Sequence, residues 1–205
     1  MARNVLLITT DQQRFDALGC NGGAFARTPN IDALAVTGLN YTQARNQSTV
    51  CMPARSTILT GQSIRRHGVT SNGIPLPEHA PNIAQLLADN GYRTALIGKW
   101  HLGLEPENHP CRRGFDHFHG FLGDMMDDYY THLRHNQNYM RHDTETIDPR
   151  GHATDLFSDW SAEFIRSRQG ASDPFYLYLA YNAPHTPIQP PEEWVERVRR
   201  REPDA

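Results

Sequence analysis

Val5-Leu6-Leu7-Ile8-Thr9 is a short, almost continuous apolar run, and it sets the pattern from which the fold can be predicted. Two later runs have the same character, Thr94–Gly98 and Phe175–Ala180, although the tyrosines of the last run also fit alternation. Near-continuous apolar strands are typical of a parallel sheet that is covered on both faces. We therefore predict three buried strands of one mostly parallel sheet.

Segments with helical spacing lie between these runs. The first starts at Thr28-Pro29 and stops at Gly38, the second carries Ile83, Leu86 and Leu87 and ends at Gly91, and the third follows a Thr154 cap with Leu156, Trp160 and Phe164 four apart. Strands that alternate with helices predict an α/β fold, a mostly parallel sheet sandwiched by helices, in one domain over residues 1–205.

Composition excludes several classes of protein. The chain has 205 residues, 38% hydrophobic and 21% charged, and a net charge of −3, which gives no reason to expect nucleic-acid or membrane partners. The basic tail Arg197–Arg201 is interpreted as a solvated helix face. No apolar run is long enough for a membrane span or a signal peptide, so we expect a cytoplasmic protein. Three cysteines (Cys20, Cys51 and Cys111) suit reduced thiols better than a disulfide framework.

Each predicted strand ends in polar residues. Asp11 follows the first strand, Lys99 and His101 follow the second, and Asn182 and His185 follow the third. Ligands of open α/β sheets bind at the carboxyl ends of the strands. The pattern alone therefore predicts that these side chains share one site.

Cys51-Met52-Pro53-Ala54-Arg55-Ser56 fits the same edge of the sheet. The segment Met52–Thr60 has the features of a helix, with Pro53 in its first turn and Gly61 just past its end. Cys51 then lies at the amino terminus, where free N–H groups favour anions, and Arg55 projects from the same face. The alternative is a buried thiol beside a surface arginine.

With these residues assembled, the chain resembles the amino-terminal part of a type I, formylglycine-dependent sulfatase of the alkaline phosphatase superfamily. The resemblance runs from Val5 to about Pro187. Its pieces are Thr10-Asp11-Gln12, Thr28-Pro29-Asn30-Ile31-Asp32, Cys51-Met52-Pro53-Ala54-Arg55, Gly98-Lys99-Trp100-His101-Leu102-Gly103, Arg113-Gly114-Phe115-Asp116 and Ala183-Pro184-His185-Thr186-Pro187.

The resemblance implies roles for individual residues. Asp11 is a metal ligand; Cys51, converted to formylglycine by a formylglycine-generating enzyme, is ligand and nucleophile; Arg55 stabilises the hydrated aldehyde; Lys99 and His185 bind the ester oxygens; His101 orients the diol; and Asn72 contacts the substrate. The implied metal is divalent, Ca²⁺ first, with Mn²⁺ or Mg²⁺ as alternatives. The implied substrate is a small-molecule sulfate ester.

Two departures from the family pattern matter. Thr10-Asp11 carries one aspartate where many sulfatases have two, which is similar to the choline-sulfatase and phosphonate monoester hydrolase branches. The family's later Asp-Asn or Asp-His pair and a further lysine have no counterpart after His185. Because Ca²⁺ takes six or more oxygen ligands, we expect an amino-terminal fragment or a truncated gene product that is inactive alone.

These observations leave several functions open. The first hypothesis is a sulfuric ester hydrolase with a formylglycine nucleophile, and the second is a phosphonate monoester or phosphodiester hydrolase with the same site. A non-catalytic oxyanion-binding module or degenerate paralogue is the third. A thiol-nucleophile hydrolase comes last, because Pro53 and Arg55 then lack a purpose.

Other chemical clusters are interpreted more simply. His117 and His119 have the spacing of a metal pair on a strand, but we interpret them as ordinary strand or loop residues. Asp124, Asp127 and Asp128 are interpreted as a solvated acidic loop. The segment Gly120–Arg150 shows no period and is predicted to be an insertion at the mouth of a site.

Overall fold

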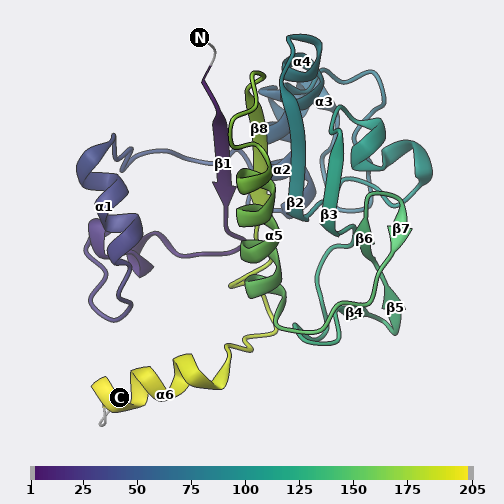
Figure 1. Cartoon of the computed structure of the whole chain (residues 1–205). Helices are drawn as coiled ribbons and strands as arrows, with labels where there is room; N and C mark the ends of the chain where they lie inside the picture. Colours follow the sequence, from purple (N-terminus) through teal and green to yellow (C-terminus); the bar gives the residue numbers. More distant parts are fainter. Residues whose placement is uncertain (1–2, 203–205) are drawn as a thin grey trace.

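A computed structural model describes residues 3–202 of the chain. Its centre is a six-stranded sheet of order β1-β8-β2-β3-β6-β7 (Figure 1). The strands are β1 (Val5–Thr9), β2 (Arg93–Lys99), β3 (His117–Phe121), β6 (Met140–His142), β7 (Glu145–Thr146) and β8 (Phe175–Ala180). The first four in spatial order are parallel, and β6 and β7 add an antiparallel edge. The predicted mostly parallel sheet is confirmed, and β2 is one residue longer at each end than predicted.

Helices cover both faces of the central strands (Figure 1). Helices α2 (Cys51–Thr60), α3 (Ile64–His67) and α4 (Ile83–Asp89) lie on one face, and α5 (Ala153–Ser167) lies on the other. Alternate residues of β2 enter two separate cores, since Leu96 packs on the α2 side while Ala95 and Ile97 pack on the α5 side. This two-sided burial explains why the strands are apolar without alternation.

The helix boundaries correct the predicted ends in two places. Helix α1 (Pro29–Thr37) has the predicted bounds, but α4 ends at Asp89 with Asn90 as its C-cap rather than at Gly91. The predicted Thr154 cap of α5 is wrong. The cap is His152, whose Nδ1 accepts a hydrogen bond from the Thr154 amide, so an imidazole takes the place of the expected hydroxyl.

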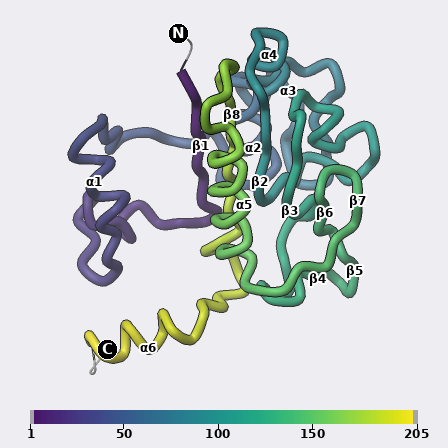
Figure 2. Tube along the Cα trace, viewed as in Figure 1, coloured from purple at the N-terminus to yellow at the C-terminus, as the bar shows by residue number. Residues whose placement is uncertain are grey.

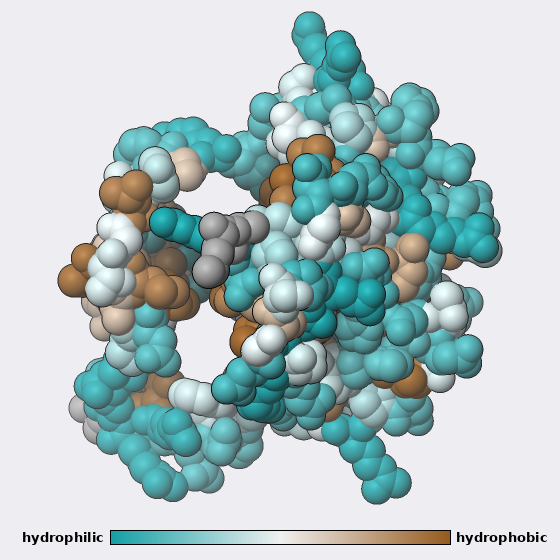
Figure 3. Space-filling model, turned by 45° about the horizontal axis from the view of Figure 1, so that its top comes forward, coloured by the Kyte–Doolittle hydropathy of each residue, from teal (hydrophilic) through white to brown (hydrophobic). Residues whose placement is uncertain are grey.

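The prediction that Val5–Thr9 is buried is also wrong for the described chain. β1 is an edge strand, and Val5, Leu6 and Ile8 are all exposed. Helix α1 lies away from the sheet with no buried residue, and openings separate its apolar side chains from the body (Figures 1 and 3). Nothing among residues 3–202 covers the outer edge of β1.

The carboxyl-terminal helix α6 (Glu192–Arg201) also extends away from the sheet, toward the α1 segment (Figure 2). Its arginines form ion pairs with Glu192, Glu196 and Glu202, which fits the predicted solvated face. No helix among residues 3–202 combines the length and the apolar content that crossing a bilayer requires.

The segment 120–150 is more regular than predicted. It contains the end of β3, the strands β6 and β7, and a separate two-stranded hairpin of β4 (Leu133–Arg134) and β5 (Gln137–Asn138). These strands are only two or three residues long, too short for a period to mark them, and only the pairing of β3 with β6 joins residues about 20 apart. Short 3₁₀ helices at residues 15–17, 19–21, 106–108 and 110–112 complete the fold.

Candidate active site

The carboxyl ends of β1, β8 and β2 bring most of the predicted residues together. Asp11 lies two residues beyond β1, Lys99 is the last residue of β2, and His185 lies in the loop after β8. The Asp11 amide donates to the Ala183 carbonyl at 3.2 Å, which fastens the β1 and β8 loops to each other. Parallel strands therefore position an acid, an amine and an imidazole at one edge.

A buried charge cluster forms the floor of the site. The Lys99 ammonium and the Arg55 guanidinium both donate to Oδ2 of Asp11, at 2.6 and 3.1 Å. A second Arg55 nitrogen donates to the Lys99 carbonyl at 3.0 Å. The Lys99 side chain is 0% exposed and the other two are 10% exposed or less, so the bonds are shielded from water.

The surplus of positive charge shifts the protonation equilibria of the cluster. Burial raises the pKa of Asp11, but Lys99 and Arg55 outweigh that effect, and its pKa is lowered. Burial and the Arg55 charge lower the pKa of Lys99, with Asp11 opposing them. The cluster thus keeps Asp11 ionised. Two cations and one carboxylate leave a net positive charge at this edge of the sheet, which suits an anionic ligand.

Cys51 is the first residue of α2, at the amino end of the helix. The helix runs from Cys51 to Thr60, one residue longer than predicted, and ends at Gly61, whose φ of 64° is left-handed. Cys51 lines a small cavity of about 150 Å³ together with Asp11 and Arg55. One ligand atom each of Asp11, Cys51 and His185 lies within 4.8 Å of the others.

His101 and His185 contribute imidazoles from different loops. His101 is buried, has a φ of 53°, and leaves its Nδ1 without a hydrogen-bond partner among the described residues. Burial, with Lys99 and Arg55, lowers the pKa of His101 to about 3, so the ring is neutral near pH 7. The His185 Nδ1 lies 2.8 Å from the Thr186 carbonyl oxygen, which holds the ring in the loop after β8.

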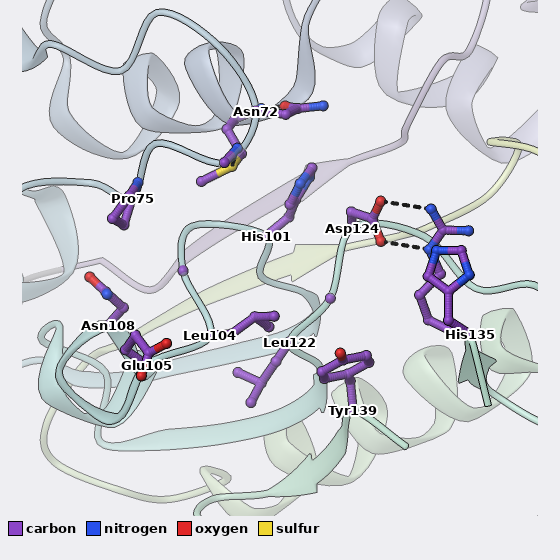
Figure 4. Close-up of a pocket in the computed structure, with 15 residues that line it drawn as sticks. Asn72, Pro75, His101, Leu104, Glu105, Asn108, Leu122, Asp124, His135 and Tyr139 are labelled. Atoms are coloured by element: carbon purple, nitrogen blue, oxygen red, sulfur yellow. Dashed lines mark hydrogen bonds and ion pairs between the residues drawn. The ribbon is translucent and has the colours of Figure 1, made fainter. Parts of the chain in front are cut away.

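Asn72 lies at the border of this site and a larger cavity. Its side-chain oxygen accepts the Met52 amide at 3.0 Å, so it holds the first turn of α2 next to Cys51. Asn72, Met52 and His101 also line a neighbouring cavity of about 570 Å³ (Figure 4). The two cavities share no lining residue, but Met52 of the larger one follows Cys51 of the small one in the chain, so the larger cavity lies next to the site.

The segment 120–150, predicted to lie at the mouth of a site, provides much of the lining of this larger pocket, although the sequence did not identify which of its side chains line it. Polar and aromatic side chains from four segments of the chain line it: Glu105, Asn108, Asp124, Arg134, His135 and Tyr139. The Asp124 carboxylate accepts two bonds from Arg134, at 3.0 and 3.2 Å (Figure 4). Asp124 is thus a half-buried, paired group and not part of a solvated acidic loop. No local pattern could have identified it, because its partner comes from the β4–β5 hairpin.

Asn182, predicted to lie at a strand end, lies two residues beyond β8. It is 2% exposed, and neither its amide nitrogen nor its side-chain oxygen has a partner among residues 3–202. Its neighbours Tyr181 and Ala183 bond to the backbone of Thr9 and Asp11, which places Asn182 beside the Asp11 loop. A buried amide without partners at this edge is a further candidate ligand-binding group.

The residues present provide only part of a calcium site. Among the described residues Asp11 is the one carboxylate at this edge, and both cations of the floor bond to its Oδ2. Ca²⁺ takes six to eight oxygen ligands. Asp11 and an oxygen at position 51 can hold one side of such an ion, and they do not complete its ligand set.

Comparison with known proteins finds a matching family model and similar solved structures. The family model described as Sulfatase matches residues 3–205. N-acetylgalactosamine-6-sulfatase of Canis lupus familiaris is 30% identical over 212 residues, covering 90% of this chain and 40% of that protein. The crystal structure of Ps i-CgsB has a TM-score of 0.91 at 32% identity, covering 97% of this chain and 49% of that one.

A third similar protein was solved with a ligand. The structure of BT4656 in complex with its substrate D-glucosamine-2-N,6-O-disulfate has a TM-score of 0.80 at 30% identity, covering 93% of this chain and 36% of that one. The chain spans less than half of the length of each of these three proteins.

Proposed function

The chain belongs to the sulfatase family, and from that premise we propose that its site hydrolyses sulfate monoesters through a nucleophile derived from Cys51. The observation that carries the proposal is the convergence at Cys51. Asp11 and His185 have ligand atoms within 4.8 Å of the thiol and of each other, and Asp11 is fixed by Lys99 and Arg55. Cationic and neutral donors thus surround the residue that the family oxidises to formylglycine.

The nucleophile must overcome the negative charge of the ester. The hydrated aldehyde supplies one hydroxyl that attacks sulfur, releasing the alcohol, and a second hydroxyl whose deprotonation expels sulfate and regenerates the carbonyl. Lys99 and His185 bind the non-bridging oxygens and stabilise the charge that they gain in the transition state. Arg55 holds position 51 from one turn along α2.

His101 takes the proton in the second step. A base must be unprotonated before it acts. The pKa of His101 is lowered to about 3, so its ring is neutral at physiological pH. Asp124 lines the larger pocket together with His101, and its charge raises the pKa of His101 against burial and the two cations.

We propose a sulfated carbohydrate as the substrate class. The relatives named above include an N-acetylgalactosamine-6-sulfatase and a protein solved in complex with D-glucosamine-2-N,6-O-disulfate. The larger pocket offers hydrogen-bonding side chains, such as Glu105 and Arg134, together with the aromatic ring of Tyr139. Such a lining suits the hydroxyl groups and apolar face of a sugar.

A divalent metal completes the proposed site, and Ca²⁺ fits a donor set of carboxylate and hydroxyl oxygens. Asp11 and position 51 hold one side of it. Because no further carboxylate of the described chain reaches this edge, we propose that residues 1–205 alone do not turn over a sulfate ester.

Steady-state kinetics distinguish the proposed sulfatase from the second candidate function, a phosphonate monoester or phosphodiester hydrolase. The single aspartate of Thr10-Asp11 suggests that alternative. The chain is tested in the longest form that its gene encodes, with aryl sulfates, sulfated sugars and aryl phosphonates. The proposal predicts a higher kcat/KM for the sulfate esters and loss of turnover in Cys51→Ala. A preference for phosphonates, or full activity in that variant, would refute it.

A further inference from the structure

A second cluster of chemically active side chains lies on the α5 face of the sheet, outside the site described above. His119 of β3 lies directly opposite His142 of β6 in the antiparallel register, and His117 is two residues earlier on the same face of β3. The ring centroids are 4.7 Å apart for His119 and His142, and 5.3 Å for His117 and His142. One nitrogen of each ring lies within 4.8 Å of the other two.

The three rings are held in place by their surroundings. His119 stacks on Trp160 of α5, with ring centroids 3.4 Å apart, and His117 lies parallel to Phe164 one turn later. The imidazole rings of His119 and His142 make no hydrogen bond among residues 3–202, so their nitrogens are available to a ligand. Side chains fixed by two paired strands and one helix make a more precise site than side chains on a loop.

His117 also has a carboxylate partner of the kind that orients metal-binding histidines. Its Nδ1 lies 2.9 Å from Oδ1 of Asp143, and that carboxylate is itself held by the Phe118 amide at 2.9 Å. A histidine that donates one N–H to a carboxylate presents the lone pair of its other nitrogen to a metal. This interaction selects the tautomer with Nε2 free.

We propose that His117, His119 and His142 bind a first-row transition-metal ion of the Zn²⁺ class. Three imidazoles suit Zn²⁺, Ni²⁺ or Cu²⁺ and do not suit Ca²⁺, whereas the Cys51 site prefers oxygen ligands. Nitrogens of a tetrahedral zinc site lie about 3.4 Å apart, given Zn–N distances of about 2.1 Å. A small closing movement of the rings therefore assembles the site.

The surrounding cavity leaves room for a fourth ligand. It measures about 380 Å³, and its lining includes Glu163, which forms no ion pair among the described residues. Water or the Glu163 carboxylate completes the tetrahedron. No lining residue of this cavity lines either of the two cavities at the Cys51 site. The bound ion joins β3 to β6, and α5 packs over it, so it stabilises this edge of the sheet.

The test is zinc binding measured by calorimetry in the 205-residue chain, in a Cys51→Ala/His185→Ala background that disables the other cluster of ligands. We expect one equivalent of Zn²⁺ and a rise in the melting temperature. Co²⁺ in its place should give the visible spectrum of a tetrahedral site without thiolate bands. His142→Ala removes an exposed ligand and should abolish stoichiometric binding at equimolar metal.

Three more variants keep the result interpretable. His119→Gln should also lose the bound equivalent, Asp143→Asn should weaken binding about 10- to 100-fold, and His79→Ala, an exposed histidine elsewhere, should leave it unchanged. Absence of zinc binding at equimolar metal in the folded background protein would overturn the proposal. So would binding that survives both His119→Gln and His142→Ala. Either failure leaves the proposed sulfatase site untouched, because the two sites share no residue.

Discussion

At the scale of single residues, the buried carboxylate of Asp11 holds the floor of the site together. Its Oδ2 accepts from both Lys99 and Arg55, and these two cations have no other carboxylate partner among the described residues. Removing one partner of a buried ion pair leaves uncompensated charge, which costs more than the pair itself contributes.

Asp11→Asn should therefore lower the free energy of unfolding by about 3 to 5 kcal/mol. Urea titration followed by circular dichroism measures this change. Asp16→Asn is the matched control, because Asp16 pairs with Arg14 on the surface and should leave the midpoint unchanged. Equal midpoints for Asp11→Asn and the wild type would show that the cluster does not stabilise the fold.

The lowered pKa of His101 should make the stability of the fold depend on pH. Its pKa is about 3 in the folded state, lowered by burial, Lys99 and Arg55 against the opposing charges of Asp124 and Asp11, and its ordinary value is 6.5. Between these values the unfolded chain binds the proton and the folded chain does not, so stability is present above pH 6.5 and is lost as pH falls toward 3.

The free energy of unfolding of His101→Gln should fall less steeply over that range than that of the wild type. Thermal melts at half-unit steps from pH 4 to 7.5 measure the slopes, with His79→Gln as the control for an exposed histidine. Parallel curves for His101→Gln and the wild type would contradict the buried, neutral imidazole.

At the scale of elements, the strand β2 and the helix α2 position Lys99 and Cys51. Each element has a glycine at or next to its carboxyl end. Gly98, with a φ of 105°, comes immediately before Lys99, and a Cβ there would lie 2.1 Å from the Ala180 carbonyl oxygen of β8. Gly61 ends α2 with a φ of 64° and open space around it. A side chain at position 98 is therefore disfavoured both by its neighbours and by the backbone conformation. A side chain at position 61 is disfavoured by the backbone conformation alone.

Gly98→Ala should cost more than about 3 kcal/mol of unfolding free energy, because the new methyl group forces β2 and β8 apart. Gly61→Ala should cost about 1 kcal/mol, the strain of a left-handed alanine. Chemical denaturation of both variants measures the difference. Equal costs would mean that the close approach of β2 to β8 is not required.

At the scale of the whole molecule, one edge of the sheet stays open. β1 pairs with β8 on one side, and its exposed Val5, Leu6 and Ile8 have no cover among residues 3–202. An exposed apolar edge strand is a template for association with another chain.

The 205-residue chain should therefore self-associate as its concentration rises, and Leu6→Lys should suppress this. Sedimentation velocity at several concentrations measures the effect. Leu86→Lys, which places the same charge on an exposed position of α4, should leave association unchanged. A wild-type chain that stays monomeric at all concentrations would contradict association through the exposed edge of β1.

Much of this architecture could be predicted from local pattern. The strands and helices near the site follow from apolar runs and from Gly61 and Gly38 as stops, because those signals lie within a few residues of the element. The grouping of Asp11, Lys99 and His185 follows from strand direction alone. Edge position is not local information, which is why the prediction of a buried Val5–Thr9 was wrong.

Contacts between distant segments explain the other differences. The Asp124–Arg134 pair and the approach of His142 to His117 and His119 depend on how separate strands and loops are placed beside one another. The same holds for the two side-chain atoms of Asn182 that lack a partner among residues 3–202. In the sequence, His117 and His119 have the features of ordinary strand residues. The third imidazole, that of His142, reaches them only because β6 pairs with β3.

The most direct test of the central claim is mass spectrometry of the tryptic peptide Asn46–Arg55, taken from protein made in a host that has the formylglycine-generating enzyme. We predict that position 51 carries an aldehyde in place of its thiol in a substantial fraction of molecules, and that Cys51→Ser abolishes this product. An unmodified thiol in every molecule would contradict the proposed nucleophile and the mechanism built on it.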